Sequence, residues 1–348
     1  MSDDRTAKER YQATHPAGIF LDGGDLSTLS ALFERHKWLA PGEKLLSATP
    51  HAKPTSNLVL HVQTDRRRLI LKQARPWHEA RPTIEMSDSR ALVEARFFAV
   101  AAEDPLLARH HPRLIGVDDP SRALLFEDLN PLGDFSDLYT GSRVTQAELN
   151  TLVAYLSSLH ALAVEKEPLF EGNAMRQERY DALLVIPIFD HDTATLDTET
   201  PGLAREADRL RQDERFFDGL RRLGDSFMAD GPWLVHGDFV PTNWMRCPNG
   251  VNILGGEHAM KGRIELDIGM MLGHLMLAGQ ASPGWMLDEY EPPGEFDLKL
   301  AMGFAGAEIV RRVIGPDRVQ THPGLMQKRI LLSLGKELVL RPDRELLG

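Results

Sequence analysis

Residues 236–243, His-Gly-Asp-Phe-Val-Pro-Thr-Asn, combine residue types and a spacing that suit phosphoryl transfer from ATP. In that chemistry an aspartate accepts or orients the proton of the attacking hydroxyl, and an asparagine five residues later gives Mg²⁺ an oxygen ligand. The segment therefore predicts Asp238 as the catalytic base and Asn243 as a metal ligand. The alternative is a loop in which both side chains only cap their own turns.

A lysine and a glutamate earlier in the chain supply the second half of such an apparatus. Lys72 lies in the apolar stretch of residues 69–73, and Glu94 lies in the helical pattern that follows. A lysine that is held by a helix glutamate can bind the phosphates of a nucleotide. Taken singly, each side chain could equally be a solvated surface charge. Their order along the chain, before Asp238 and Asn243, favours a nucleotide site.

The elements expected around Lys72 and Glu94 form a small part that mixes strands and a helix. A polar turn between two alternating apolar stretches predicts an antiparallel hairpin. The expected strands are residues 58–63, 68–73 and 123–127. A helix is expected to begin at residues 87–89, and its spacing predicts one packed face. That face would contain Leu92, Ala95, Ala99 and Ala102.

The rest of the chain is expected to be mainly helical. Thr145 and Glu148 match a capping box that opens a helix, and residues 298–314 repeat the helical spacing. Between these helices, residues 243–247 and 251–254 flank the turn signal Pro-Asn-Gly, which predicts a hairpin. The turn-rich residues after 127 mark the boundary between the two parts. The predicted fold is therefore two-lobed and α+β, with lobes at residues 1–128 and 129–348.

The composition of the 348 residues limits the classes of protein to consider. Hydrophobic residues make up 42% and charged residues 26%, which indicates a globular chain. The net charge of −11 argues against a general nucleic-acid-binding surface. A single cysteine excludes an internal disulfide. Because the chain lacks both an apolar leader pattern and a 20-residue apolar run, we expect a cytoplasmic protein without a membrane segment.

Several stretches resemble the aminoglycoside phosphotransferase and choline kinase superfamily, and within it most closely the 5-methylthioribose kinases. Residues 69–77 and 90–94 resemble the family's lysine strand and glutamate helix, and residues 262–274 resemble the segment after its metal-binding loop. Residues 305–315 resemble its late helix with paired arginines. The similarity runs from about residue 57 to 340 and is weaker between 170 and 229. It implies a protein-kinase-like fold and the phosphorylation of a small metabolite's hydroxyl by ATP with Mg²⁺.

The resemblance also implies roles for individual residues. Glu127 and Leu129 would bracket a hinge whose backbone meets adenine, and Asn57 would end a turn, residues 53–57, that covers the nucleotide. Asp267 would be a buried carboxylate that holds the catalytic loop. The implied cofactor-binding residues are Asn57, Lys72, Glu94, Glu127 and Leu129.

Two positions in the second half bear on the substrate and the metal. Arg311 and Arg312 would reach the sugar substrate, although a basic helix C-terminus would explain them as well. Gly255 stands where the family carries an acidic residue that binds the metal. Glu257, two residues later, is therefore expected to hold Mg²⁺ together with Asn243.

The substrate stays open at this point. The resemblance implies a thiosugar such as 5-methylthioribose, and the alternatives are an aminoglycoside, a choline-like amino alcohol or another sugar. An acidic pocket would favour cationic substrates, whereas the arginine pair would favour a neutral or anionic sugar. A different class is a nucleotide-binding protein that lost catalysis with the metal-binding aspartate. The expected partners are ATP and the small-molecule substrate. The sequence leaves open whether the protein is a monomer or a homodimer.

Overall fold

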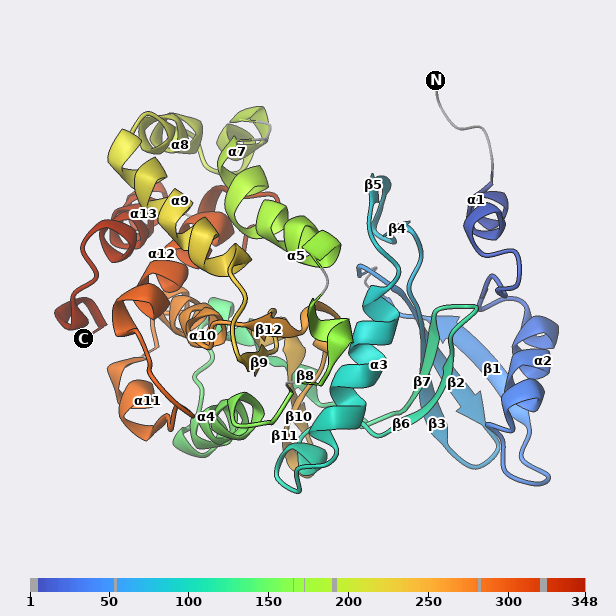
Figure 1. The fold of residues 1–348 in the computed structure, drawn as a ribbon. Helices are drawn as coiled ribbons and strands as arrows, with labels where there is room; N and C mark the ends of the chain where they lie inside the picture. The colour runs from blue at the N-terminus through green and yellow to red at the C-terminus, as the bar shows by residue number, and fades with distance from the viewer. Residues whose placement is uncertain are drawn as a thin grey trace. The chain divides into compact units, whose positions relative to one another are not determined.

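The structure is a computed structural model that describes residues 6–52, 55–164, 166–171, 173–189, 193–280, 283–319 and 324–347. The chain divides into two compact units, Met1–Asn130 and Pro131–Gly348 (Figure 1). The boundary predicted from the sequence lies two residues earlier in the chain.

The first unit is built on a five-stranded antiparallel sheet with the strand order β1-β2-β3-β7-β6. Its strands are β1 (Leu45–Pro50), β2 (Leu58–Thr64), β3 (Arg68–Gln73), β4 (Trp77–His78), β5 (Arg81–Glu85), β6 (Leu114–Asp118) and β7 (Ala123–Glu127). Its helices are α1 (Ala7–Thr14), α2 (Leu26–His36), α3 (Arg90–Ala101) and the 3-10 turn η1 (Leu107–Arg109). The predicted hairpin is β2–β3, and the predicted strand at residues 123–127 is β7, so both predictions are confirmed.

The two faces of this sheet have different partners, α2 on one side and α3 on the other (Figure 1). Successive side chains of a strand point to opposite faces. Leu69 and Leu71 of β3 are buried in one core cluster with Leu29 and Phe33 of α2. Lys72 follows Leu71 in the strand, so its side chain points to the opposite face, toward α3. The alternation along β3 thus directs one cation away from the apolar core.

The packed face predicted for α3 is only partly right. Ala95 is buried, but Ala99 and Ala102 are exposed. The helix instead buries Val93 and Phe97, along with most of its circumference. Large apolar side chains remove more surface from water than alanine does, so they decide which face packs.

The second unit is mainly helical. Its helices are α4 (Gln146–His160), α5 (Asn173–Tyr180), α6 (Ile186–Phe189), α7 (Thr193–Glu199), α8 (Leu203–Arg211), α9 (Glu214–Met228), α10 (Glu265–Leu277), α11 (Pro283–Glu289), α12 (Leu298–Ile314) and α13 (Leu325–Leu340), with the shorter turns η2 (Phe135–Thr140), η3 (Pro168–Glu171), η4 (Asp181–Val185), η5 (Pro241–Asn243), η6 (Gly256–His258) and η7 (Arg344–Leu347). Its short strands are β8 (Gly133–Asp134), β9 (Trp233–Val235), β10 (Trp244–Cys247), β11 (Gly250–Ile253) and β12 (Met260–Gly262). Three predictions are confirmed here: the capping box that opens α4, the β10–β11 hairpin and the extent of α12.

Helix α12 packs against α10 and against α13 (Figure 1). Small residues let their backbones approach closely. A Cβ at Gly273 of α10 would lie 3.0 Å from the carbonyl oxygen of Ala305 on α12. On the other side of α12, a Cβ at Gly306 would overlap the carbonyl of Gly335 on α13. Within the described residues, no helix is both long enough and apolar enough to cross a membrane.

Candidate active site

The predicted catalytic loop follows β9 and is held by a buried carboxylate. Asp267, near the start of α10, accepts hydrogen bonds from the backbone N–H groups of His236 at 2.6 Å and Gly237 at 2.9 Å. His160 Nε2 lies 3.1 Å from the same carboxylate. Gly237 has φ +73°, and a Cβ there would overlap the carbonyl of His258, so the turn needs glycine. The holding role expected for Asp267 is confirmed.

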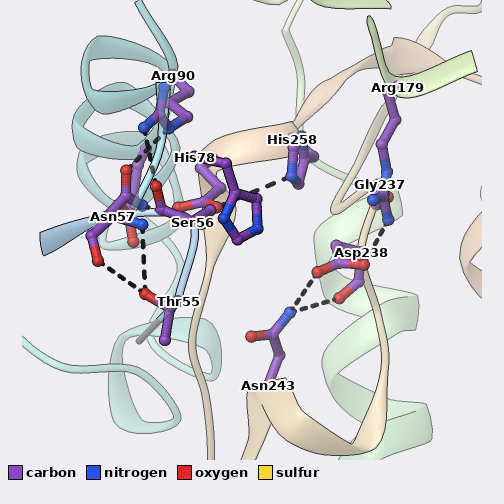
Figure 2. Close-up of polar contacts among 12 residues, drawn as sticks. Thr55, Ser56, Asn57, His78, Arg90, Arg179, Gly237, Asp238, Asn243 and His258 are labelled. Atoms are coloured by element: carbon purple, nitrogen blue, oxygen red, sulfur yellow. Dashed lines mark hydrogen bonds and ion pairs between the residues drawn. The ribbon is translucent and has the colours of Figure 1, made fainter. Parts of the chain in front are cut away.

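Asn243 turns back onto Asp238, the predicted base. The 3-10 turn Pro241–Asn243 brings the carboxamide close enough for its Nδ2 to donate to the backbone oxygen of Asp238 at 2.8 Å and to Oδ2 at 2.9 Å. Figure 2 shows Asn243 and Arg179 approaching the Asp238 carboxylate from different sides. The spacing of five residues thus places the two predicted side chains in direct contact.

Arg179 is the closest cation to Asp238 among the described residues. It comes from α5, donates from Nε and Nη2 to the carbonyl of Gly237 at 3.0 and 2.8 Å, and forms an ion pair with the Asp238 carboxylate. Burial by itself would raise the pKa of Asp238, but the charges of Arg179, His258 and Arg312 hold that pKa well below the ordinary value of 3.8. Asp238 is therefore ionised at neutral pH.

The paired arginines of α12 are anchored by one buried glutamate. Arg311 donates from Nε and Nη2 to both oxygens of Glu308, at 2.8 and 2.7 Å, and Arg312 donates from Nε to Oε1 at 2.8 Å. Glu308 and Arg311 are each 3% exposed. Both arginines lie in the last turn of α12, as the helix-end explanation expects, and their contact with a sugar substrate stays a prediction. Both arginines also lower the pKa of Asp238 through their charge.

A histidine and a tyrosine complete this group. His274 Nε2 lies 2.8 Å from Glu308, and its Nδ1 lies 2.5 Å from the hydroxyl of Tyr139. Burial lowers the pKa of His274 from 6.5 to about 4. Nδ1 of a neutral His274 can accept from Tyr139, whereas Nε2 lies close to Glu308 without the geometry of a hydrogen bond. These five residues, Glu308, Arg311, Arg312, His274 and Tyr139, are called the arginine cluster below.

The residues expected to hold Mg²⁺ fit that ion in part. Since Asn243 donates through Nδ2, its Oδ1 is left for another partner, and a Cβ at Gly255 would lie 2.9 Å from that oxygen. An amide oxygen beside a carboxylate oxygen suits Mg²⁺, which otherwise keeps waters and substrate phosphates as ligands. Glu257 is buried, with Oε1 3.8 Å from His258 Nε2, and its metal role stays a prediction. Nowhere in the described part of the chain do three or more His, Cys, Asp or Glu side chains gather in a metal-binding group.

In the first unit, Lys72 and Glu94 form a close ion pair. Lys72 Nζ lies 2.6 and 2.7 Å from the two oxygens of Glu94, and Glu94 is 2% exposed. The pair joins β3 to α3. This is the geometry expected of a lysine that a helix glutamate holds in place for phosphate binding.

A buried arginine forms hydrogen bonds to the turn before β2. Arg90 donates from Nε to Asn57 Oδ1 at 2.8 Å and from Nη2 to the carbonyl of Ser56 at 3.1 Å (Figure 2). Asn57 therefore helps to hold the turn, and a contact with nucleotide stays a prediction. The first two residues of this turn, Lys53 and Pro54, lie outside the described residues.

The predicted hinge lies at the end of β7. The backbone N–H of Glu127 donates to the carbonyl of Arg113 at 3.0 Å, and the Asp128 carboxylate accepts from the N–H of Asn130 at 2.8 Å. A contact of Glu127 with adenine would therefore use its carbonyl rather than its N–H. The hinge role of Glu127 and Leu129 stays a prediction.

Comparisons with known proteins agree with this arrangement. Residues 47–290 match the model of the phosphotransferase enzyme family, APH. The chain belongs to this family. It is accordingly a small-molecule kinase, with ATP as its phosphate donor and Mg²⁺ as the accompanying metal ion.

Similar sequences are named methylthioribose kinase. The one from Geobacillus thermodenitrificans (strain NG80-2) is 24% identical over an alignment 338 positions long, and the alignment covers 82% of this chain and 84% of that protein. The one from Exiguobacterium sibiricum is 24% identical over 341 residues, with coverages of 82% and 85%. Both alignments cover most of this chain and therefore reach into both of its units.

A solved structure supports the fold. Spectinomycin phosphotransferase APH(9)-Ia, in complex with ADP and spectinomycin, is 13% identical and has a TM-score of 0.52, with 90% of this chain and 98% of that chain covered. The expected two-lobed, protein-kinase-like α+β fold is confirmed.

Sequence reasoning missed several residues that the site uses. Arg179 lies in the stretch where the family resemblance is weak, and its signal was a second arginine, Arg176, on the same helix face three residues earlier. Glu308 stands one helical turn before the arginine pair, and His274 interrupts an apolar run. Glu308 and His274 were both visible as polar residues among apolar ones, but their partners could not be identified without the fold.

Proposed function

We propose that this kinase transfers the γ-phosphate of ATP to a hydroxyl of a thiosugar such as 5-methylthioribose. The observation that carries the reaction type is the contact of Asn243 and Arg179 with the ionised Asp238 carboxylate. The sugar is supported by the relatives named methylthioribose kinase, which match 82% of this chain.

In this proposal each residue has one task. Asp238 orients the acceptor hydroxyl and takes its proton as the new oxygen–phosphorus bond forms. Lys72, steadied by Glu94, binds the phosphates of ATP. Asn243, with Glu257, would hold Mg²⁺, which neutralises phosphate charge when it is bound.

The charges around Asp238 favour an uncharged or anionic acceptor over a cationic one. Three guanidinium groups, those of Arg179, Arg311 and Arg312, lie in this part of the second unit, and two carboxylates, those of Asp238 and Glu308, pair with them. The sum of these five charges is +1. An aminoglycoside or a choline-like amino alcohol would meet repulsion here, and another neutral sugar is therefore the second candidate.

The test is a product-mass assay with ATP and Mg²⁺ over a panel of neutral sugars, sugar acids, amino sugars and amino alcohols. We expect the wild type to phosphorylate 5-methylthioribose and Asp238→Asn to lower turnover by ~10²–10⁴-fold with nearly unchanged ATP binding. Asp218→Asn, on the exposed side of α9, is the control and should keep full turnover.

Full turnover in Asp238→Asn would exclude the mechanism. Phosphorylation of cationic acceptors alone would exclude the proposed substrate class. ATP binding without phosphorylation of any acceptor would favour a kinase that has lost catalysis.

A further inference from the structure

Helix α5 changes its winding just after Arg179. It continues directly into the π-helical segment η4 and then into α6. A π-helical turn inside a longer helix is rare and is frequently found at a functional site. Arg179 lies two residues before η4, and its side chain reaches Gly237 and Asp238 in the catalytic loop (Figure 2). The irregular part of the helix is therefore next to the arginine that contacts the predicted base.

Arg179 uses only part of its hydrogen-bonding capacity. A guanidinium group carries five N–H donors in one plane, one on Nε and two on each terminal nitrogen. Nε and Nη2 of Arg179 donate to the carbonyl of Gly237, and Nη2 also donates to Asp238. Nη1 donates to no residue that the structure describes, and it is not buried. Two N–H groups are therefore accessible beside the Asp238 carboxylate.

We propose that Arg179 recognises the acceptor through Nη1, by donating to a hydroxyl oxygen next to the hydroxyl that receives the phosphate. The substrate is then a neutral molecule with hydroxyl groups on two neighbouring carbon atoms. The inference rests on the proposed function, because it assumes that the reacting hydroxyl binds at Asp238. It deepens that function by giving the acceptor a second required group.

The geometry of the guanidinium group fits two neighbouring hydroxyl groups. Nη1 and Nη2 are attached to one carbon, so Nη1 lies beside the carboxylate oxygen that Nη2 contacts. That oxygen, Oδ1 of Asp238, accepts more than one hydrogen bond, so it can also accept from the reacting hydroxyl. Hydroxyl oxygens on neighbouring carbons lie about as far apart as two hydrogen-bonded atoms. The second hydroxyl therefore comes within reach of Nη1.

The charges at this position favour a hydroxyl over a charged group. Arg179 and Asp238 form an ion pair without net charge. A carboxylate or phosphate of the acceptor at Nη1 would lie close to the Asp238 carboxylate and would be repelled by it. An ammonium group would face a guanidinium group, which has no lone pair to accept its protons. A hydroxyl oxygen avoids both effects and accepts from a charged donor.

Arg176, three residues earlier on α5, provides the matched control. It donates to the carbonyls of Met228 at 3.0 Å and Lys261 at 2.6 Å, and to the carboxylate of Asp230 at 2.8 Å. None of these partners lies in the catalytic loop. Arg176→Gln should therefore lower the melting temperature and leave the choice between acceptors unchanged.

The test compares 5-methylthioribose with its 2-deoxy counterpart, because the 2-hydroxyl is next to both other hydroxyl groups of this sugar. We expect the wild type to have a kcat/KM ~10–100-fold higher for 5-methylthioribose, the range for a hydrogen bond from a charged donor. Lysine keeps the charge beside Asp238 but lacks the planar fork of N–H groups. Arg179→Lys should therefore use both sugars with kcat/KM values within about twofold of each other.

The comparison of two sugars in one variant isolates the contact at Nη1. Weaker support of Asp238 in Arg179→Lys lowers kcat/KM for both sugars alike, so it cancels in their ratio. Arg179→Gln is the second variant and should lose the preference in the same way. The inference is overturned if both Arg179 variants keep the wild-type ratio, or if Arg176→Gln loses it.

A measurement without turnover separates this inference from the proposed function. Isothermal titration calorimetry of the ADP-bound wild type should give a dissociation constant ~10–100-fold lower for 5-methylthioribose than for the 2-deoxy sugar. Arg179→Lys should remove the difference. If the wild type shows this difference but phosphorylates neither sugar, the proposed substrate is wrong and the inference stands. Equal dissociation constants, or no binding of either sugar, overturn the inference even if the protein phosphorylates another acceptor.

Discussion

Gly255 stands where the family carries an acidic residue, and its backbone conformation disfavours any residue with a side chain. Its φ is +79° and its ψ is 56°, and a Cβ there would press on the Asn243 carboxamide. The left-handed region costs other residues ~1–2 kcal/mol. We predict that Gly255→Asp lowers the free energy of unfolding by about 1–2 kcal/mol and lowers turnover, because it displaces the side chain that holds Asp238. Urea unfolding and the product-mass assay measure the two effects.

Gly279→Asp is the control for backbone strain, since Gly279 has φ +60° with open space around its Cβ position. It should lower stability to a similar degree and leave turnover unchanged. A gain of phosphotransfer in Gly255→Asp, with an unchanged melting curve, would contradict the prediction and favour a kinase that has lost its metal ligand.

Residues whose chemistry depends on local spacing were predictable from the sequence. Asp238 and Asn243 are five residues apart in one loop, and the turn between them sets their contact. Arg179 could not be predicted, because its partner lies 59 residues away and only the packing of α5 brings them together. Motif spacing carries information about short-range contacts alone.

At the scale of elements, α12 carries a buried ionic group whose removal has a defined cost. Glu308 is the one carboxylate that the described contacts place between Arg311 and Arg312. We predict that Glu308→Gln lowers the free energy of unfolding by about 3–5 kcal/mol, because it leaves two guanidinium groups without a buried counter-charge. Glu337→Gln, at a half-exposed position of α13 beside Arg341, should change it by under ~1 kcal/mol. Equal effects in urea unfolding of the two variants would show that the cluster is well solvated.

Elements that depend on local signals were predicted correctly from the sequence, whereas features that depend on packing were not. The hairpins and the start of α4 follow from turn and capping residues that act within a few positions. The packed face of α3 does not, because α3 is buried around most of its circumference and a single apolar stripe does not describe it. The close approach of α12 and α13 at Gly306 could likewise not be predicted, because it depends on which helix packs against α12.

For the molecule as a whole, His274 makes stability depend on pH. Its pKa falls from 6.5 to about 4 on folding, so the unfolded chain binds the proton more strongly. The stability that the neutral ring contributes is present above pH 6.5 and is lost as the pH falls to about 4, by up to about 3 kcal/mol. We predict that His274→Gln flattens this part of the curve of unfolding free energy against pH. Urea titrations at several pH values measure the difference between the two proteins, and a constant difference would contradict the prediction.

The contacts of Asp267 have a consequence for how the catalytic loop opens. The amide protons of His236 and Gly237 belong to no sheet, yet both are bonded to a carboxylate with no exposed surface. Such protons exchange with solvent only when the structure around the acceptor opens. In hydrogen exchange the loop should therefore behave as a part of α10, opening with that helix and not with the surface turns. The segment that meets the substrate would then belong to the slowest-exchanging part of its unit.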